Sequence, residues 1–340
     1  MSETLLRLEH VTTSFRIDNA YYPAVDDLSL TVNNDEVLAI VGESGCGKSA
    51  LALSIMQLHR PGKTSITGHI YLKGQDLLSA SRDQLDKIRG KDIGMIFQDS
   101  LTALNPLMTV EKQITENMDY HLSLNNAEKR AHVLELLTAV GIHNPERIAS
   151  QYPHELSGGM RQRVMIALAV ACNPELVIAD EPTTALDVTI QAQVIALLKK
   201  VQKDRHSGII LITHNLGVVA EMADRVAVMY AGQIVEMTDV MTLFANPLHP
   251  YTRSLLNSIP SATSVRDKLH VIQGIVPSIQ HIPHIGCRFA PRIPWVEASE
   301  HEANPQLHEA EPGHWVRCTC YRHFSFPDNL KEGDVQDVLS

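Results

Sequence analysis

The sequence predicts an α/β fold in which helices cover a mainly parallel β-sheet. Strand-like and helix-like hydrophobic patterns alternate along most of the 340 residues. A glycine-rich loop joins a short apolar strand to a helix. Hydrophobic residues make up 44% of the chain but aromatic residues only 5%, so small aliphatic side chains dominate and suit the packing of helices on a sheet.

The N-terminal part of the chain is expected to consist mainly of strands. Loosely alternating segments separated by turn residues predict strands, and a continuous apolar run predicts a buried one. Apolar residues at helical spacing follow the glycine-rich loop. The expected strands are residues 5–11, 28–32, 37–41, 68–74 and 93–97, and the expected helix is 51–58.

Helical patterns dominate residues 99–155. Asn125 and Glu128 have the spacing of a capping box, which marks the start of a helix, and Gly141 can end that helix. Strand and helix patterns then alternate again, as in a sheet whose parallel strands are connected by helices. These later elements are expected at residues 176–179 (strand), 188–201 (helix) and 209–213 (strand).

The character of the sequence changes after about residue 246, where proline and histidine become frequent and periodicity fades. This predicts an irregular C-terminal appendage outside the main sheet.

Charge and composition argue against several classes of protein. The net charge of −10 argues against a nucleic-acid partner, because nucleic-acid binders are more often basic. No apolar run approaches the roughly 20 residues that a membrane-spanning helix needs, and the first residues lack the pattern of a secretory signal. The odd number of cysteines has no obvious disulfide framework and favours a reducing cytoplasm; they are Cys46, Cys172, Cys287, Cys318 and Cys320.

The clearest chemical motif is a phosphate loop at residues 42–49. Gly-Glu-Ser-Gly-Cys-Gly-Lys-Ser fits G-x-x-x-x-G-K-[ST] and lies between an expected strand and an expected helix, as the motif requires. Backbone N–H groups of such a loop surround phosphate oxygens at the positive end of the helix. Lys48 would reach the β- and γ-phosphates and Ser49 would hold Mg²⁺. A glycine-rich turn with an incidental lysine is the less favoured interpretation, and Cys46 is expected to be a small filler.

An apolar strand that ends in two acids, Asp180 and Glu181, forms the second motif. Two carboxylates at the end of a buried strand need a compensating partner, which a metal ion and a water molecule provide. Asp180 would support Mg²⁺, and Glu181 would act as the general base on the attacking water. Alone the pair is equally consistent with a solvated strand end, but the phosphate loop upstream favours the catalytic interpretation.

Residues 156–163, Leu-Ser-Gly-Gly-Met-Arg-Gln-Arg, resemble the LSGGQ signature of the ABC ATPases, with Met160 in place of the usual glutamine. Ser157 can cap the helix that follows. Gly158 and Gly159 leave the backbone open at the start of that helix, which suits an anion. Ser-Gly-Gly alone is weak, but its place between a phosphate loop and an Asp-Glu strand is highly specific.

Three further motifs of this family follow in order. Gln98 matches the Q-loop, Asp187 the D-loop and His214 the switch histidine. Each has a simple alternative, namely a surface glutamine, a helix cap and a hydrogen-bonded histidine at a strand end. Their order supports the resemblance, which extends over about residues 4–260.

The resemblance implies a P-loop ATPase core with an antiparallel β subdomain, an inserted helical subdomain and a C-terminal extension. The boundaries that we expect are 1–98 and 156–245 for the core, 99–155 for the helical subdomain and 246–340 for the extension. The resemblance also implies ATP and Mg²⁺ as ligands. The expected nucleotide-binding residues are Gly42, Glu43, Ser44, Gly45, Cys46, Gly47, Lys48, Ser49, Ala50 and Phe15, and the expected Mg²⁺ ligands are Ser49, Gln98 and Asp180. Phe15 would stack on adenine, with Tyr21 and Tyr22 as alternatives.

The family mechanism requires two such domains that face each other head to tail. Each ATP would lie between the phosphate loop of one domain and signature residues 157–160 of the other. Gln98 would sense Mg²⁺ and the attacking water, and His214 would contact the γ-phosphate and Glu181. The helical subdomain would contact the membrane subunits.

The C-terminal segment narrows the resemblance to the oligopeptide/dipeptide importer group, which also includes nickel importers. Residues 246–252, Asn-Pro-Leu-His-Pro-Tyr-Thr, resemble the start of its extension, and residues 286–292, Gly-Cys-Arg-Phe-Ala-Pro-Arg, resemble its later core. An ATPase subunit that energises peptide uptake is therefore implied. Nickel or another small solute is the main alternative cargo, and ABC ATPases of DNA repair or translation are distant alternatives.

The group's organisation implies several partners. These are a second ABC ATPase subunit, with a paralogue favoured, two transmembrane permeases, and an extracytoplasmic peptide-binding protein that acts through the complex. No nucleic-acid partner is expected. The permeases would hold the chain at the cytoplasmic face of the cell membrane.

The extension departs from some members of the group, which carry four cysteines that can hold an iron–sulfur cluster. Cys287 and Cys318 occupy two of these positions, but Ile293 and Glu300 occupy the others, and Cys320 is too close to Cys318 to replace both. We therefore predict no iron–sulfur cluster. Zinc binding by the cysteines with nearby histidines is an alternative, although scattered surface histidines are favoured; these are His281, His284, His301, His308 and His314.

Overall fold

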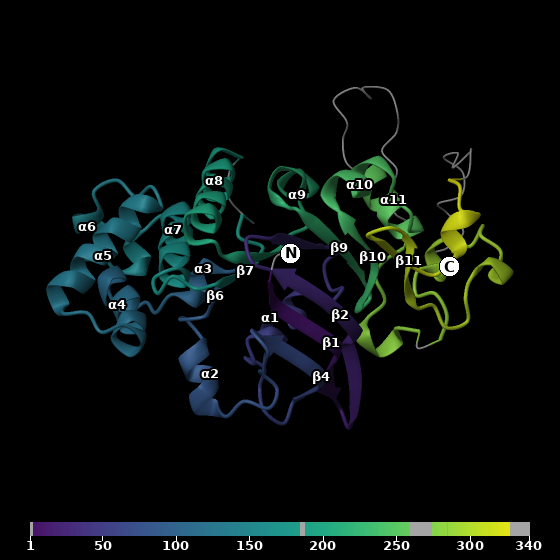
Figure 1. Ribbon diagram of the computed structural model, residues 1–340, viewed down its shortest axis with the longest axis horizontal. Coiled ribbons are helices and arrows are strands. Elements are labelled where there is room, and N and C mark those ends of the chain that lie inside the picture. The colour runs from purple at the N-terminus through teal and green to yellow at the C-terminus, as the bar shows by residue number, and fades with distance from the viewer. Residues whose placement is uncertain (1–2, 184–187, 259–273, 284, 327–340) are drawn as a thin grey trace.

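The computed structural model describes residues 3–183, 188–258, 274–283 and 285–326. Figure 1 shows sheets near the centre, a group of helices at one end and the C-terminal segments at the other. Within these ranges, every helix is too short or too polar to cross a lipid bilayer.

An eight-stranded sheet forms the centre of the molecule. In spatial order its strands are β11 (Leu307–Glu311), β12 (His314–Arg317), β10 (Gln233–Asp239), β9 (Arg225–Tyr230), β3 (Val37–Val41), β8 (Gly208–Ile212), β7 (Leu176–Asp180) and β6 (Ile93–Ile96). Neighbouring strands from β9 to β6 run parallel, which confirms the predicted mainly parallel sheet. Strands β3, β7 and β8 are buried along their whole length, as expected when helices or a second sheet cover both faces.

A smaller antiparallel sheet packs against one face of the main sheet. Its strands are β2 (Ala20–Asn33), β1 (Thr4–Ile17), β4 (Thr64–Leu72) and β5 (Gln75–Asp76), in that order. Side chains of β3 divide between two cores because successive residues of a strand point to opposite faces. Leu38 and Ile40 pack with the small sheet, whereas Val37, Ala39 and Val41 pack with the helices on the other face.

A helical region lies at one end of the main sheet, at the left of Figure 1. Asn125 and Glu128 form the predicted capping box at the start of its longest helix. The region consists of α3 (Ser100–Ala103), α4 (Val110–His121), α5 (Asn126–Ala139), α6 (Pro145–Ala149) and the 3₁₀ helix η1 (Pro153–Glu155). Helix α7 (Gly158–Ala169) contacts α3, α4 and α5 and joins this region to β6.

The remaining helices cover the two faces of the main sheet. Helix α1 (Lys48–Ile55) packs between the two sheets, and α2 (Arg82–Ile88) follows the small sheet. Figure 1 shows the others along the opposite face: α8 (Val188–Arg205), α9 (Leu216–Met222), α10 (Val240–Ala245) and α11 (Pro250–Asn257).

The expectation that the C-terminal appendage lies outside the main sheet is wrong. Strand β12 pairs antiparallel with β10, and β11 pairs with β12, so this hairpin extends the sheet. The two strands are short and rich in charged and histidine residues, which hides their pattern. His314 is buried instead of exposed, because its Nε2 lies 2.8 Å from a carboxylate oxygen of the buried Glu236. The rest of the extension contains the 3₁₀ helices η2 (Ile279–His281), η3 (Ala290–Arg292), η4 (Ala298–Glu300) and η5 (Cys320–Arg322).

Candidate functional site

The phosphate loop, residues 42–49, connects the end of β3 to the start of α1. Gly47 caps α1 with a φ of 107°. A Cβ atom at Gly47 would lie 2.3 Å from the carbonyl oxygen of Ala24, and one at Gly42 would lie 2.1 Å from that of Met229. Only glycine fits at these two positions, so the loop packs directly on the backbone of β2 and β9.

Lys48 lies in the interior of this loop and is only 6% exposed. Its Nζ donates to the carbonyl oxygens of Gly42 at 2.8 Å and Glu43 at 2.9 Å, and lies 3.7 Å from Cys46 Sγ. Burial raises the pKa of the Cys46 thiol, so this residue stays neutral beside the ammonium group. The loop therefore holds a single cation among its own carbonyl groups.

Asp180 ends β7 and is buried, with 4% exposure. Burial raises the pKa of its carboxyl group; a hydrogen bond with Ser49 opposes the rise, Glu181 adds to it and Lys48 opposes it. Atom Oδ1 is buried and has no hydrogen-bond partner among the described residues. An unpaired carboxylate oxygen is costly, and a divalent cation held by this oxygen and the Ser49 hydroxyl would remove the cost. These two residues therefore fit a Mg²⁺ ion.

Glu181 and His214 come from the ends of adjacent strands and form a pair. Glu181 Oε2 lies 3.0 Å from His214 Nδ1, with side-chain exposures of 13% and 60%. Glu181 has a left-handed φ of 48°, and its N–H donates to the carbonyl oxygen of Ile212 at 2.9 Å. Such a conformation is uncommon for a residue with a side chain and clusters at functional sites. The histidine therefore fixes the orientation of a carboxylate at the edge of the sheet.

Gln98 lies two residues beyond the end of β6 and is exposed. Strand β6 runs parallel to β7, with Ile96 opposite Ala179. Because the carboxyl ends of parallel strands meet at one edge, Gln98 lies on the same edge of the sheet as Asp180. Asp187, the D-loop candidate, lies outside the described residues.

The signature residues begin α7. Ser157 caps this helix as predicted, since its Oγ accepts the Met160 N–H at 3.3 Å. Ser157 and Gly158 are exposed, so the helix start is open to solvent. The buried Gln162 was missed by the sequence analysis: its Nε2 donates to the carbonyl oxygen of Pro182 at 2.7 Å. This bond ties the signature helix to the residue after Glu181.

Phe15, the candidate for adenine stacking, lies on β1 opposite Tyr22 of β2 and is half-buried. Its ring meets the edge of the His59 ring, with 5.4 Å between centroids and 76° between planes. The same hairpin reaches the phosphate loop at Ala24. Tyr21 is 49% exposed. All three aromatic candidates therefore belong to the hairpin that contacts the loop.

The C-terminal extension also contacts the phosphate loop, which the sequence analysis missed. The guanidinium of Arg292 binds both carboxylate oxygens of Glu43, at 2.6 and 3.2 Å. The Tyr251 hydroxyl accepts the Glu43 N–H at 2.8 Å. Arg292 and Tyr251 are buried. Tyr251 packs against Tyr230 and Phe289 in tilted and edge-to-face contacts, and the Arg292 guanidinium lies over the Phe289 ring. No local pattern signals this contact, because Glu43 and Arg292 lie far apart in the sequence.

Comparisons with known proteins show the family of the chain. Residues 25–184 match the family described as "ABC transporter", and residues 235–298 match "Oligopeptide/dipeptide transporter, C-terminal region". The oligopeptide transport ATP-binding protein OppD of Lactococcus lactis subsp. cremoris (strain SK11) is 50% identical over 333 residues, covering 98% of both chains. The oligopeptide transport ATP-binding protein AppD of Bacillus subtilis (strain 168) is 49% identical, covering 94% of this chain and 97% of AppD.

Solved structures of ATP-binding cassettes share the fold. The cassette MJ0796, solved as a dimer in a post-hydrolysis state with ADP and phosphate, matches with a TM-score of 0.63 and 29% identity, over 69% of this chain and 99% of that one. The structure of cbiO1 from Clostridium perfringens matches with a TM-score of 0.61 and 27% identity, over 72% of this chain and 92% of that one. The chain therefore belongs to the ABC transporter ATP-binding subunits, in the oligopeptide transport branch of that family.

Proposed function

We propose that this chain hydrolyses ATP at the edge of its parallel sheet and thereby energises peptide uptake through partner permeases. The observation that carries the proposal is the meeting of three elements. These are Lys48 inside the loop after β3, Asp180 beside Ser49, and Glu181 paired with His214. The relatives that define the branch are named for oligopeptide transport, which supports peptides over nickel as cargo. The same names argue against a role in DNA repair or translation.

Each residue at this edge has a distinct part in the proposed reaction. Lys48 exchanges its bonds to the loop carbonyls for bonds to the β- and γ-phosphates of ATP. Ser49, Gln98 and Asp180 hold Mg²⁺, which when bound neutralises charge on the phosphates. Glu181 accepts the proton of the attacking water, and His214 keeps the carboxylate oriented. The remaining loop residues supply backbone N–H groups, and Phe15 or a neighbouring tyrosine stacks on adenine.

A second ATPase subunit completes the site in this proposal. The exposed start of α7 offers Ser157, Gly158, Gly159 and Met160 to an ATP bound by another subunit. The dimeric cassette with ADP and phosphate supports such an arrangement. We propose a paralogue as the partner, with Asp187 at the interface between the two.

We assign membrane coupling to the helical subdomain, residues 99–155. This subdomain is inserted between the core segments 1–98 and 156–245. A groove of about 540 Å³ lies between the end of the main sheet and α4, lined by Met56, Arg89, Phe97 and Tyr120 among others. Phe97 is 36% and Tyr120 61% exposed, which suits an apolar segment of a permease.

We propose that two transmembrane permeases hold the chain at the cytoplasmic face of the cell membrane and connect it to an extracytoplasmic peptide-binding protein. We expect ATP and Mg²⁺ as the ligands of the core, and no iron–sulfur cluster in extension residues 246–340.

Purified variants test the chemistry. Lys48→Ala is expected to weaken ATP binding, whereas Glu181→Gln should retain ATP and lower turnover by about 10²–10⁴-fold, the usual contribution of a general base. Radiolabelled ATP binding and phosphate release measure the two effects separately. Near-normal hydrolysis by Glu181→Gln would show that another group is the base.

Uptake tests the cargo. Labelled oligopeptides and labelled nickel are supplied to cells that express wild-type protein or Lys48→Ala at equal levels. We expect loss of peptide uptake with nickel uptake unchanged. Loss of nickel uptake alone would keep the ATPase assignment and contradict the peptide assignment.

A further inference from the structure

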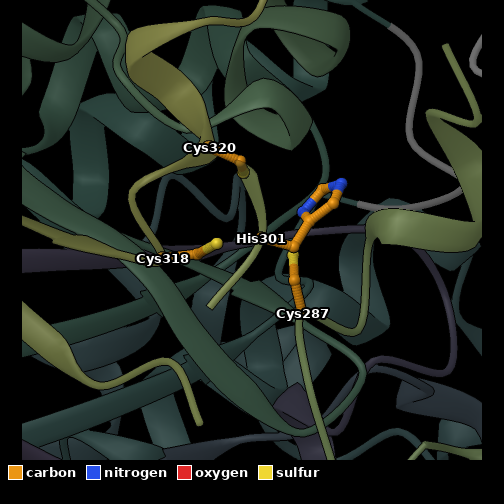
Figure 2. A group of neighbouring side chains, drawn as sticks. All are labelled: Cys287, His301, Cys318 and Cys320. Carbon is orange, nitrogen blue, oxygen red and sulfur yellow. The ribbon is translucent and has the colours of Figure 1, made fainter. Parts of the chain in front are cut away.

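Four side chains of the extension converge on one point. They are Cys287, in the turn before η3, His301, directly after η4, and Cys318 and Cys320, after β12. Figure 2 shows the three thiols and the imidazole directed at a common centre, and their four ligand atoms all lie within 4.8 Å of one another. Segments far apart in the extension therefore meet at a single cluster.

The three thiols of the cluster are buried, and His301 is partly buried. The three cysteines are 7%, 0% and 0% exposed, and all five cysteines of the chain, each within the described residues, are free thiols. His301 Nδ1 is buried and has no hydrogen-bond partner among the described residues. An imidazole nitrogen left unpaired in a buried site is costly, so this atom requires a ligand.

The spacing of the ligand atoms identifies the class of ligand. Structural zinc is held tetrahedrally by combinations that include three cysteines and one histidine. With Zn–S bonds of about 2.3 Å, tetrahedral geometry puts neighbouring sulfurs about 3.8 Å apart, within the limit observed here. A four-iron cluster places each thiolate on a different iron and so holds the sulfurs farther apart. The compact set, with an imidazole as its fourth member, fits one ion.

We propose that Cys287, His301, Cys318 and Cys320 bind one structural zinc ion. This reverses the sequence-based preference for scattered surface histidines, and it agrees with the prediction that no iron–sulfur cluster is present. All four positions are taken by protein ligands, which is typical of a structural site and leaves no place for a substrate. The ion joins the turn before η3 to the end of the β11–β12 hairpin, so it fastens the extension to the main sheet.

Metal analysis of the purified full-length chain tests the proposal. Zinc and iron are measured by mass spectrometry on wild-type protein, on His301→Ala and on Cys320→Ser. We expect about one zinc per wild-type chain, much less in either variant, and a wild-type level in Cys172→Ser, a matched control in which a buried free cysteine outside the cluster is replaced. Stoichiometric iron with strong visible absorbance, or wild-type protein that neither contains nor takes up zinc, would overturn the proposal.

The main result of a second measurement needs only wild-type protein, so it does not depend on the folding of a variant. Zinc is removed from wild-type protein by a chelator and replaced with Co²⁺, whose spectrum reports its ligands. We expect the absorption bands of tetrahedral cobalt together with thiolate charge-transfer bands, and weaker charge transfer in Cys320→His, which keeps a ligand but removes a sulfur. Octahedral cobalt bands in wild-type protein, or a disulfide between two of these cysteines under reducing conditions, would contradict the assignment.

Discussion

Asp180 places a carboxyl group where the fold largely excludes water. Burial raises the pKa of its carboxyl group above that of the unfolded chain, so the stability it gives is present at low pH and is lost as the pH rises through the folded-state pKa. At neutral pH the buried carboxyl group therefore destabilises the protein in the absence of nucleotide. Retention of such a residue is explained by the ion that it is proposed to hold.

Replacement of Asp180 should separate stability from function. We expect Asp180→Asn to raise the free energy of unfolding in the absence of nucleotide by about 1–3 kcal/mol, because a neutral amide is less costly to bury than an unpaired charge. The added stability that Mg²⁺ and ATP give to wild-type protein should be largely absent from the variant. Denaturant unfolding with and without Mg²⁺ and ATP measures both effects. A variant less stable than wild type in the absence of nucleotide would contradict this explanation.

The residues of the candidate site differ in how far sequence could predict them. Lys48, Ser49, Asp180 and Glu181 belong to motifs in which adjacent residues share one loop or strand end, so spacing alone brings them together. Arg292 gave no such signal, because its partner in the phosphate loop lies at the other end of the chain.

Helix α11 begins at a buried histidine. His249 Nδ1 accepts the Tyr251 N–H at 3.1 Å and thereby caps the helix. Burial lowers the pKa of His249 to about 4; Glu236 and Cys318 oppose the shift, whereas Arg317 and His301 add to it. Near pH 6.5 the imidazole is therefore neutral in the folded protein, whereas in the unfolded chain it already binds protons.

This difference predicts a loss of stability in mild acid. The stability due to neutral His249 is fully present above the unfolded pKa of 6.5 and falls as the pH drops toward 4, so about 2 kcal/mol should be lost between about pH 7.5 and pH 5. His249→Asn keeps a capping oxygen but does not titrate. The denaturation midpoint should decrease less between about pH 7.5 and about pH 5 in the variant than in wild type. Equal losses would show that other groups cause the acid sensitivity.

Elements with strong local signals were predicted within a few residues. The buried strands β3, β7 and β8 are continuous apolar runs, and the capping box of α5 is readable from two residues. Strands β11 and β12 were missed because their pairing with β10, and not their own pattern, makes them strands. The four proposed metal ligands lack a Cys-x-x-Cys spacing, so the sequence gave no equivalent signal for them.

At the scale of the whole molecule, the extension continues the main sheet of the ATPase core through strands β12 and β11. A chain that ends after Asn257 lacks β11 and β12 and exposes β10 as an edge strand. We expect it to aggregate, or to unfold at a temperature lower than wild type by roughly 5 °C or more. A chain that ends at Phe326 keeps every described C-terminal element and serves as the control. Equal thermal stability of the two would show that the extension is an independent appendage.

The contact between Arg292 and Glu43 should affect nucleotide binding. Arg292→Met leaves the Glu43 carboxylate without this guanidinium, so its negative charge opposes the phosphates of ATP. We expect the Kd for ATP to rise about tenfold, or roughly 1.4 kcal/mol. In the double variant Glu43→Gln/Arg292→Met the opposing charge is gone, so most of the affinity should return. Calorimetry on wild type, Glu43→Gln, Arg292→Met and the double variant measures this coupling. Identical affinities would show that the ion pair is only structural.

The same contact has a thermodynamic consequence for the proposed zinc ion. Arg292 follows Cys287 in one short segment, so a ligand that orders this segment also orders the partner of the phosphate loop. Free-energy coupling between two binding sites is reciprocal. If zinc strengthens ATP binding by some factor, ATP must retain zinc more tightly by that same factor. A subunit in steady turnover would then keep its metal longer than an idle one.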